Sequence, residues 1–334
     1  MGVCVGEPAC PSVSDFLIGT ARLCYPYLCG LEKLPKTDVS IQPMANQKNN
    51  QPNHNLKPRL AYENHRFLRS ADARTLRIAS EYLEPLSRLR RAGVQNTVVF
   101  FGSARILSHE NALRQLQELT KKRREKGDAA VSRAALLAAR RALDMSRYYE
   151  DARELARLVT EWSLTCGNGP HFLVVCSGGG PGIMEAANRG AREAGGKTIG
   201  LNITLPREQS VNPYVSPELC FLFRYFFMRK LWFAYPARAL MVFPGGFGTM
   251  DEMMEFLTLV QTHKISRRIT ILLYGSKYWK KTVNFNSFVE SGTIDQDDLK
   301  LLRFVDSPQE AFGILKVNLG HDRMFRGPQR FPFV

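Results

Sequence analysis

The sequence predicts an α/β protein built on a parallel sheet with helices on both faces. Short apolar runs, typical of buried strands, alternate along the chain with segments of helical periodicity, and this alternation indicates a parallel sheet. Glycine-bearing loops directly follow three of these runs, at the carboxyl ends of strands where open parallel sheets bind ligands. The predicted strands are 97–101, 172–176, 198–201, 219–223, 239–243, 270–274 and 303–305.

The composition is that of an ordinary globular protein. The chain has 334 residues, of which 44% are hydrophobic and 23% charged, enough to bury a sizeable core. Its seven cysteines are irregularly spaced and form no CxxC pair, so free thiols in a reducing compartment are expected. The apolar stretch 16–31 contains Arg22 and Pro26 and is shorter than the roughly 20 residues of a spanning helix. We therefore expect a cytoplasmic protein without a membrane segment.

The chain divides into a predicted tail and a predicted single domain. Residues 1–56 show no strand or helix period and include the polar run 46–53, which predicts a disordered tail. Residues 57–334 are expected to form one domain that opens with an N-terminal helical layer at 59–91, broken or kinked by Pro85. A helical insertion follows at about 108–150, in which Lys126-Gly127-Asp128 separates two helices.

Two glycine-bearing loops follow the first two predicted strands. Gly102 and Ser103 come directly after 97–101, where a plain turn explains them equally well. The loop 177–186, Ser-Gly-Gly-Gly-Pro-Gly-Ile-Met-Glu-Ala, lets backbone amides near Gly179 and Gly180 approach an anion at the start of the next helix. It is not a dinucleotide fingerprint, because no acidic residue ends a second strand about 20 residues later.

The third loop is Pro-Gly-Gly-Phe-Gly-Thr-Met-Asp-Glu at 244–252. Amides near Gly245, Gly246 and Gly248, with Thr249 expected at the start of a helix, suit a phosphate. The loop lacks the GK[ST] of a nucleoside triphosphatase. Glu252 has two interpretations. Its spacing from Thr249 is that of a capping box, which would stabilise the start of the helix. Alternatively, it contacts the ribose of a nucleotide from the helix face that it shares with Glu255.

A basic pair lies upstream among aromatic residues. Arg229 and Lys230 either end a solvated helix or hold a phosphate. The neighbouring aromatics, Phe226 and Phe227 among them, are predicted to belong to the core rather than to stack on a base.

Taken together, these motifs resemble the Lonely Guy (LOG) family of nucleoside 5′-monophosphate phosphoribohydrolases, often labelled lysine decarboxylase-like. The resemblance covers about residues 97–315, includes every fixed position of PGGxGTxxE, and is nearest to the longer bacterial members. It implies a Rossmann-like, doubly wound sheet, a homo-oligomer, and hydrolysis of a nucleotide to free base and ribose 5-phosphate, with cytokinin riboside monophosphates as one candidate substrate class. The essential residues fall on Arg229 and Glu252. Compact members carry MxxRK, whereas this chain has Phe226 in place of the methionine that borders the base.

The resemblance also sets expectations for ligands. No cofactor and no metal are expected, and a pyridoxal phosphate site is not indicated. A non-catalytic nucleotide or molybdenum-cofactor binding protein is the alternative. The predicted substrate-binding residues are Gly102, Ser103, Gly179, Gly180, Lys230, Gly245, Gly246, Gly248, Thr249 and Glu255.

The net charge of +15 raises the question of nucleic acid as a partner. Residues 57–149 hold 20 basic and 9 acidic side chains, which gives +11 outside most of the motifs. A solvated or oligomer-forming helical layer explains this surplus, so nucleic acid is disfavoured.

Overall fold

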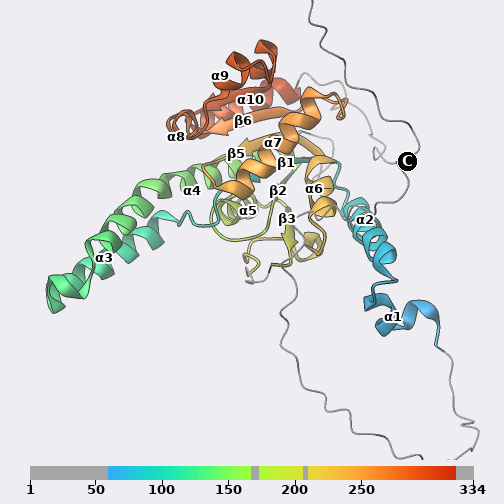
Figure 1. Cartoon of the computed structure of the whole chain (residues 1–334), viewed down its shortest axis with the longest axis horizontal. Coiled ribbons are helices and arrows are strands. Elements are labelled where there is room, and N and C mark those ends of the chain that lie inside the picture. The colour runs from blue at the N-terminus through green and yellow to red at the C-terminus, as the bar shows by residue number, and fades with distance from the viewer. Residues whose placement is uncertain (1–58, 167–172, 206–209, 321–334) are drawn as a thin grey trace, which may run out of the picture. The chain divides into compact units, whose positions relative to one another are not determined.

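The computed structural model describes residues 59–166, 173–205 and 210–320. The predicted tail and the apolar stretch 16–31 lie outside them. All seven strands pair in parallel in the order β4-β3-β2-β1-β5-β6-β7, which confirms the predicted fold class (Figure 1). The strands are β1 (Asn96–Phe101), β2 (Leu173–Ser177), β3 (Thr198–Ile203), β4 (Cys220–Phe223), β5 (Ala237–Val242), β6 (Thr270–Tyr274) and β7 (Leu302–Val305).

Helices precede, connect and follow the strands (Figure 1). They are α1 (His65–Arg69), α2 (Arg74–Arg91), α3 (His109–Lys126), α4 (Arg133–Thr165), α5 (Ile183–Glu193), α6 (Phe226–Ala234), α7 (Phe247–Gln261), α8 (Ser276–Thr282), α9 (Phe285–Glu290) and α10 (Pro308–Gly320). Short 3-10 turns lie at Ala61–Glu63, Asp128–Ala130, Pro217–Leu219 and Gln296–Leu301. No helix within the described ranges has both the length and the apolarity needed to cross a bilayer.

The two faces of the sheet carry separate cores. In β1, Val99 and Phe101 belong to a core with residues of α2, α6 and α7, whereas Val98 and Phe100 belong to a core with residues of α4, α5 and α10. Every residue of β1 is buried, so the strand reads as a continuous apolar run rather than an alternating one.

The N-terminal helical layer differs from the prediction. Pro85 does not break the helix: α2 continues through it to Arg91, and the interruption falls between α1 and α2 instead. A proline removes the amide that would bond the carbonyl four residues earlier. That carbonyl, of Glu81, accepts a hydrogen bond from the indole Nε1 of Trp232 at 2.9 Å. The tertiary contact therefore supplies the donor that Pro85 lacks.

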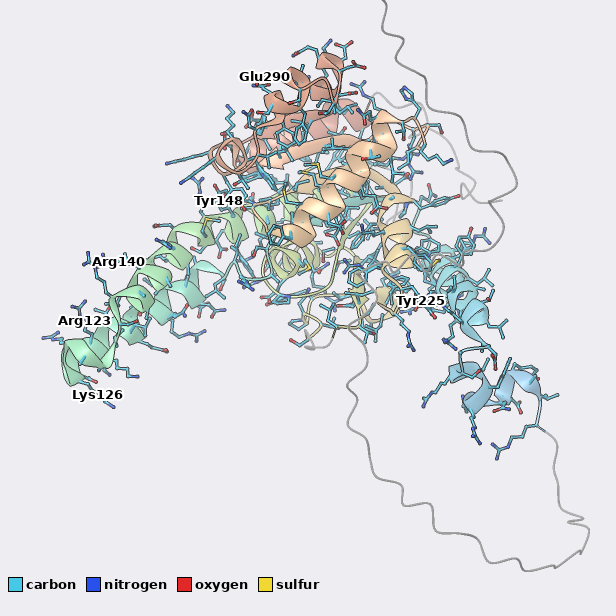
Figure 2. All side chains as sticks on the ribbon, in the orientation of Figure 1. Arg123, Lys126, Arg140, Tyr148, Tyr225 and Glu290 are labelled. Atoms are coloured by element: carbon cyan, nitrogen blue, oxygen red, sulfur yellow. The ribbon has the colours of Figure 1, made fainter. Side chains whose placement is uncertain are left out.

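The predicted insertion consists of α3 and the first half of α4, which pack side by side (Figure 1). Gly127, at a φ of 82°, ends α3 between the two predicted helices. Ala112 is the one buried residue of α3, and most of its basic side chains face solvent. Figure 2 shows Arg123, Lys126 and Arg140 along these two helices. Part of the surplus positive charge is therefore carried by exposed helices.

Candidate functional site

The order of the strands brings the three glycine-bearing loops together. The chain moves outward from β1 to β4 and then returns to β5 on the other side of β1, so the switch point of the sheet lies between β1 and β5. The amide of Ser103 donates to the carbonyl of Pro244 at 3.0 Å, and the amide of Ile183 donates to the carbonyl of Ser103 at 3.2 Å. These bonds join the loops after β1, β2 and β5 around one cavity of about 730 Å³.

The loop after β5 presents helix amides to this cavity. α7 begins at Phe247, two residues before the predicted start at Thr249, and Gly246 is its N-cap. Amides in the first turn of a helix have no acceptor within the helix, and the dipole makes this end positive. A β-carbon on Gly246 or Gly248 would meet nothing within 4 Å, although both glycines line the cavity. The first turn is therefore open to a ligand that approaches the backbone closely.

Gly245 has a different reason to be glycine. A β-carbon there would lie 2.1 Å from the Oγ1 of Thr249, which is buried. The phenol of Tyr278 donates to the carbonyl of Gly245 at 2.7 Å and so holds the turn from α8. Packing thus accounts for Gly245, whereas the open side of Gly246 and Gly248 is left for a ligand.

Glu252 lies in the second turn of α7 and takes no part in a cap. No side chain caps this helix, so the capping-box interpretation of Thr249 and Glu252 is wrong. The carboxylate of Glu252 forms an ion pair with the guanidinium of Arg229 from α6. The two side chains are 14% and 13% exposed, and both line the cavity.

Burial controls the electrostatics of this pair. Loss of solvent raises the pKa of Glu252 to about 7, because it disfavours the carboxylate more than the charge of Arg229 favours it. The Nε of Arg229 is buried and has no hydrogen-bond partner among the described residues. Its guanidinium carbon lies 5.5 Å from the ring centre of Phe226 and 5.3 Å from that of Phe233. The site thus holds a carboxyl group that titrates near neutral pH and an arginine with one buried unsatisfied donor.

Lys230 and Glu255 form a separate ion cluster. The ammonium group of Lys230 lies 2.9 Å from a carboxylate oxygen of Asp251 and 3.0 Å from one of Glu255. Neither Lys230 nor Glu255 lines the cavity that contains Glu252. These two predicted binding residues therefore lie outside the cavity of Arg229 and Glu252. This is so although Lys230 directly follows Arg229 and Glu255 is three residues after Glu252.

The aromatic residues at the start of α6 are not all in the core. Met228 and Trp232 are buried, as a core helix face requires, but Phe226 and Phe227 are 49% and 53% exposed. The prediction that places these two phenylalanines in the core is wrong. Phe226 lines the cavity instead, and Phe247, 95% exposed, stands at the start of α7. Aromatic faces are therefore available to a ligand.

The loop after β2 contributes less of the cavity than predicted. Gly178 of this loop lines the cavity, but Gly179 and Gly180 do not. Gly102 and Ser103, which line it as predicted, belong to the loop after β1. The carbonyls of Gly179 and Gly180 accept hydrogen bonds from the side-chain amide of Asn212 at 3.0 and 2.9 Å. Their amide-rich turn is thus fixed by a residue that sequence reasoning missed.

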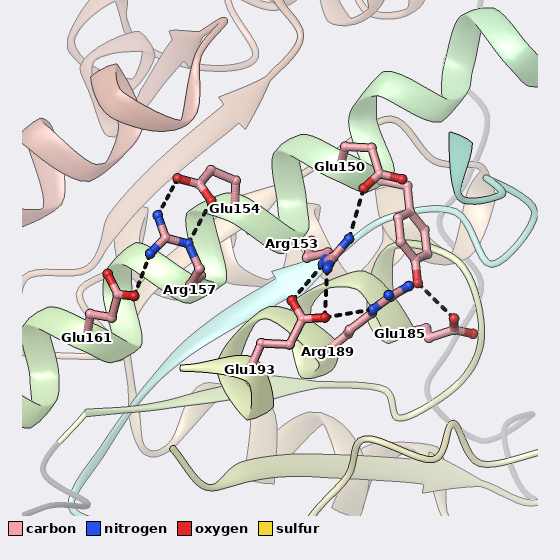
Figure 3. A network of polar contacts seen from close by, with 9 residues as sticks. Glu150, Arg153, Glu154, Arg157, Glu161, Glu185, Arg189 and Glu193 are labelled. Atoms are coloured by element: carbon pink, nitrogen blue, oxygen red, sulfur yellow. Dashed lines mark hydrogen bonds and ion pairs between the residues drawn. The ribbon is translucent and has the colours of Figure 1, made fainter. Parts of the chain in front are cut away.

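The helix that follows this loop is tied to α4 by polar contacts (Figure 3). The phenol of Tyr149 donates to Glu185 at 2.8 Å, and Arg153 bonds Glu193 at 2.7 Å. Arg189 bonds the same Glu193 at 2.9 Å. These contacts fix α5, and hence the loop at its amino end, against α4.

Other lining residues were not predicted. Asn202 near the carboxyl end of β3 could have been inferred from the strand-end rule, since β3 lies next to β2. Met184 belongs to the glycine-bearing loop 177–186, whereas nothing in the sequence pattern marks Met145 or Tyr278. The described residues contain no group of three or more histidine, cysteine, aspartate or glutamate side chains that could hold a metal ion.

Comparisons with known proteins match part of the second half of the chain. A family model described as "Possible lysine decarboxylase" matches residues 184–315. No curated protein sequence matches the chain.

Several solved structures are similar at low identity. The X-ray structure of TM1055, a structural genomics target, is 19% identical, with a TM-score of 0.39 over 66% of this chain and 99% of its own. A molybdenum cofactor binding protein from Rippkaea orientalis is 20% identical, with a TM-score of 0.35 over 51% of this chain and 88% of its own. The molybdenum cofactor carrier protein of Chlamydomonas reinhardtii is 18% identical, with a TM-score of 0.38 over 68% of this chain and 98% of its own.

Proposed function

We propose that the protein is a nucleotide phosphoribohydrolase of the lysine decarboxylase-like, or LOG, family, whose family model matches residues 184–315. It would hydrolyse the N-glycosidic bond of a nucleoside 5′-monophosphate to a free base and ribose 5-phosphate. The observation that carries the proposal is the buried Arg229–Glu252 pair beside the open first turn of α7. One cavity thereby offers a phosphate site and a carboxylate.

The reaction assigns a part to each group. The substrate phosphate lies on the amides of the first turn of α7, near Gly248 and Thr249. This places the ribose toward Glu252 in the second turn. As the bond from C1′ to the base breaks, its electron pair leaves with the base, and the sugar gains positive charge that the carboxylate stabilises. Glu252 also orients the water whose oxygen bonds to C1′.

Arg229 is not the acid in this scheme, because a guanidinium stays protonated at neutral pH. It balances the charge of Glu252 and uses its unsatisfied Nε–H to contact the phosphate or the leaving base. The proton that the base takes up comes from the attacking water, directly or through Glu252.

The decarboxylase description of the family fits the cavity poorly. Decarboxylation of amino acids commonly uses pyridoxal phosphate held by a lysine. The described residues that line the cavity include no lysine.

The decisive experiment is a turnover assay with a panel of nucleotides. Purified protein is incubated with AMP, GMP, CMP, UMP and isopentenyl-AMP, and free base and ribose 5-phosphate are both quantified. We expect equimolar release of the two products from at least one substrate. Binding without release from any of them, by folded protein of defined oligomeric state, would favour the non-catalytic nucleotide or cofactor binder.

A further inference from the structure

The charge of a phosphate in the cavity of Glu252 stays largely uncompensated unless Arg105 takes part. Among the described residues that line the cavity, the charged side chains are those of Arg105, Arg229 and Glu252. Arg229 and Glu252 form an ion pair, so together they add almost no net charge. A phosphate monoester carries about −1.5 to −2 at neutral pH, whereas the start of a helix offers only about +0.5. Arg105 is the remaining cation of this lining.

Arg105 extends from a turn that is fixed at Ser103. The amide of Ser103 donates to the carbonyl of Pro244, and the carbonyl of Ser103 accepts from the amide of Ile183. The Oγ of Ser103 accepts a hydrogen bond from the amide of Arg105 at 3.1 Å. These bonds hold the loop after β1 against the loop after β5 and the start of α5. The hydroxyl of Ser103 thus orients the turn, and Arg105 lines the cavity from a fixed backbone.

The side chain of Arg105 is free to turn to a ligand. It is exposed, and its guanidinium forms no hydrogen bond or ion pair within the part of the chain that the structure describes. Arg229, by contrast, is bound to Glu252 and lies against the rings of Phe226 and Phe233. A guanidinium presents a planar set of donors that fits two phosphate oxygens at once. Arg105 can therefore bind an anion without breaking another contact.

Lys230, the basic residue that the sequence pattern offers for the phosphate, is held elsewhere. Its ammonium group is bound by Asp251 and Glu255, and it does not line the cavity. The cation for a phosphate therefore comes from the loop after β1 and not from α6.

We propose that Arg105 binds the 5′-phosphate of the substrate together with the amides of the first turn of α7, and so restricts the protein to phosphorylated ligands. Arg105 is a specificity-determining residue in this scheme, since it contacts phosphate oxygens and takes no part in breaking the bond at C1′. Arg229 is then left to the ribose and the leaving base. The inference deepens the proposed function and rests on it for the identity of the substrate, but the phosphate contact can be measured without turnover.

Calorimetric titration of the full-length chain with ribose 5-phosphate tests this contact, because the sugar phosphate has no base to lose and stays intact. We expect Arg105→Gln to weaken binding about tenfold or more, since a charge-assisted contact is lost. Arg105→Lys should recover part of the affinity, because it keeps the charge but not the planar fork. Arg124→Gln is the matched control, since it removes an exposed arginine of α3 outside the cavity and should leave the affinity unchanged.

Steady-state kinetics with a cleaved nucleotide gives a second readout. Arg105→Gln should raise KM about tenfold and change kcat by less than about threefold, a split that a general loss of structure would not produce. Wild-type hydrolysis together with unchanged affinity for ribose 5-phosphate in Arg105→Gln would overturn the role of Arg105 and leave the hydrolase proposal standing.

The opposite combination separates the two proposals in the other direction. Weakened binding in Arg105→Gln, without hydrolysis of any nucleotide by the wild type, would overturn the hydrolase proposal and support the phosphate contact. Absence of ribose 5-phosphate binding by the wild type would overturn the inference, as would equal weakening by Arg105→Gln and Arg124→Gln.

Discussion

Glu252→Gln is the substitution whose effect on turnover can be worked out most fully from the structure. Glutamine keeps the volume of the side chain and removes its charge. The pKa of Glu252 stands at about 7 instead of the ordinary 4.5, so its charged form is about 3 kcal/mol less favourable in the folded protein than in water. A positive charge that develops on the ribose can recover that free energy in the transition state.

Three kcal/mol corresponds to about a hundredfold in rate, and the loss of an oriented water adds to it. We therefore expect Glu252→Gln to lower kcat by about 10²–10⁴-fold with AMP or another cleaved nucleotide. KM should change little, because the phosphate is bound by helix amides. Steady-state release of ribose 5-phosphate measures both constants, and thermal unfolding shows whether the variant is folded.

Glu255→Gln is the matched control. Glu255 is one helical turn further along α7, 36% exposed and paired with Lys230 outside the cavity that contains Glu252. Ion pairs exposed to this degree contribute little, so turnover should fall by less than about fivefold. The reasoning is refuted if Glu252→Gln keeps more than a tenth of the wild-type activity, or if Glu255→Gln loses as much as Glu252→Gln.

Further predictions concern pH, the phosphate site and the N-terminal layer. Between about pH 4.5 and pH 7 the folded protein holds more protons on Glu252 than the unfolded chain does, so this group contributes stability at low pH that is lost as the pH rises. Urea unfolding should show that the free energy of unfolding of the wild type falls by about 3 kcal/mol relative to that of Glu252→Gln between pH 4 and pH 8. The opposite trend is expected for turnover: kcat should rise through an apparent pKa near 7 if the ionised carboxylate is the form that acts. Gly248→Asp should raise KM at least about tenfold with little loss of stability, because its β-carbon meets no atom within 4 Å and its carboxylate repels a phosphate. Trp232→Phe should cost about 1–3 kcal/mol of unfolding free energy by leaving the carbonyl of Glu81 without its donor. Pro85→Ala restores a backbone amide to that carbonyl, so the loss should be smaller in the double variant, and equal losses would contradict this account.

The strands and the loops that follow them could be predicted because their signals are local. Buried parallel strands appear as short apolar runs, and all seven predicted runs coincide with strands to within two residues at either end. The loop after β5 was found from its glycines alone. The internal geometry of this loop could not be predicted from them. The side chain of Thr249 leaves no room for a β-carbon at Gly245, whereas Gly248 faces open space.

The pairing of Arg229 with Glu252 could not be predicted, because it depends on how two helices pack. The residues are 23 positions apart, on α6 and α7. The spacing of Thr249 and Glu252 fits a capping box equally well, and only the start of α7 at Phe247 excludes it. Periodicity likewise could not tell which aromatics of α6 face the core, since Phe226 and Phe227 are as apolar as the buried Trp232.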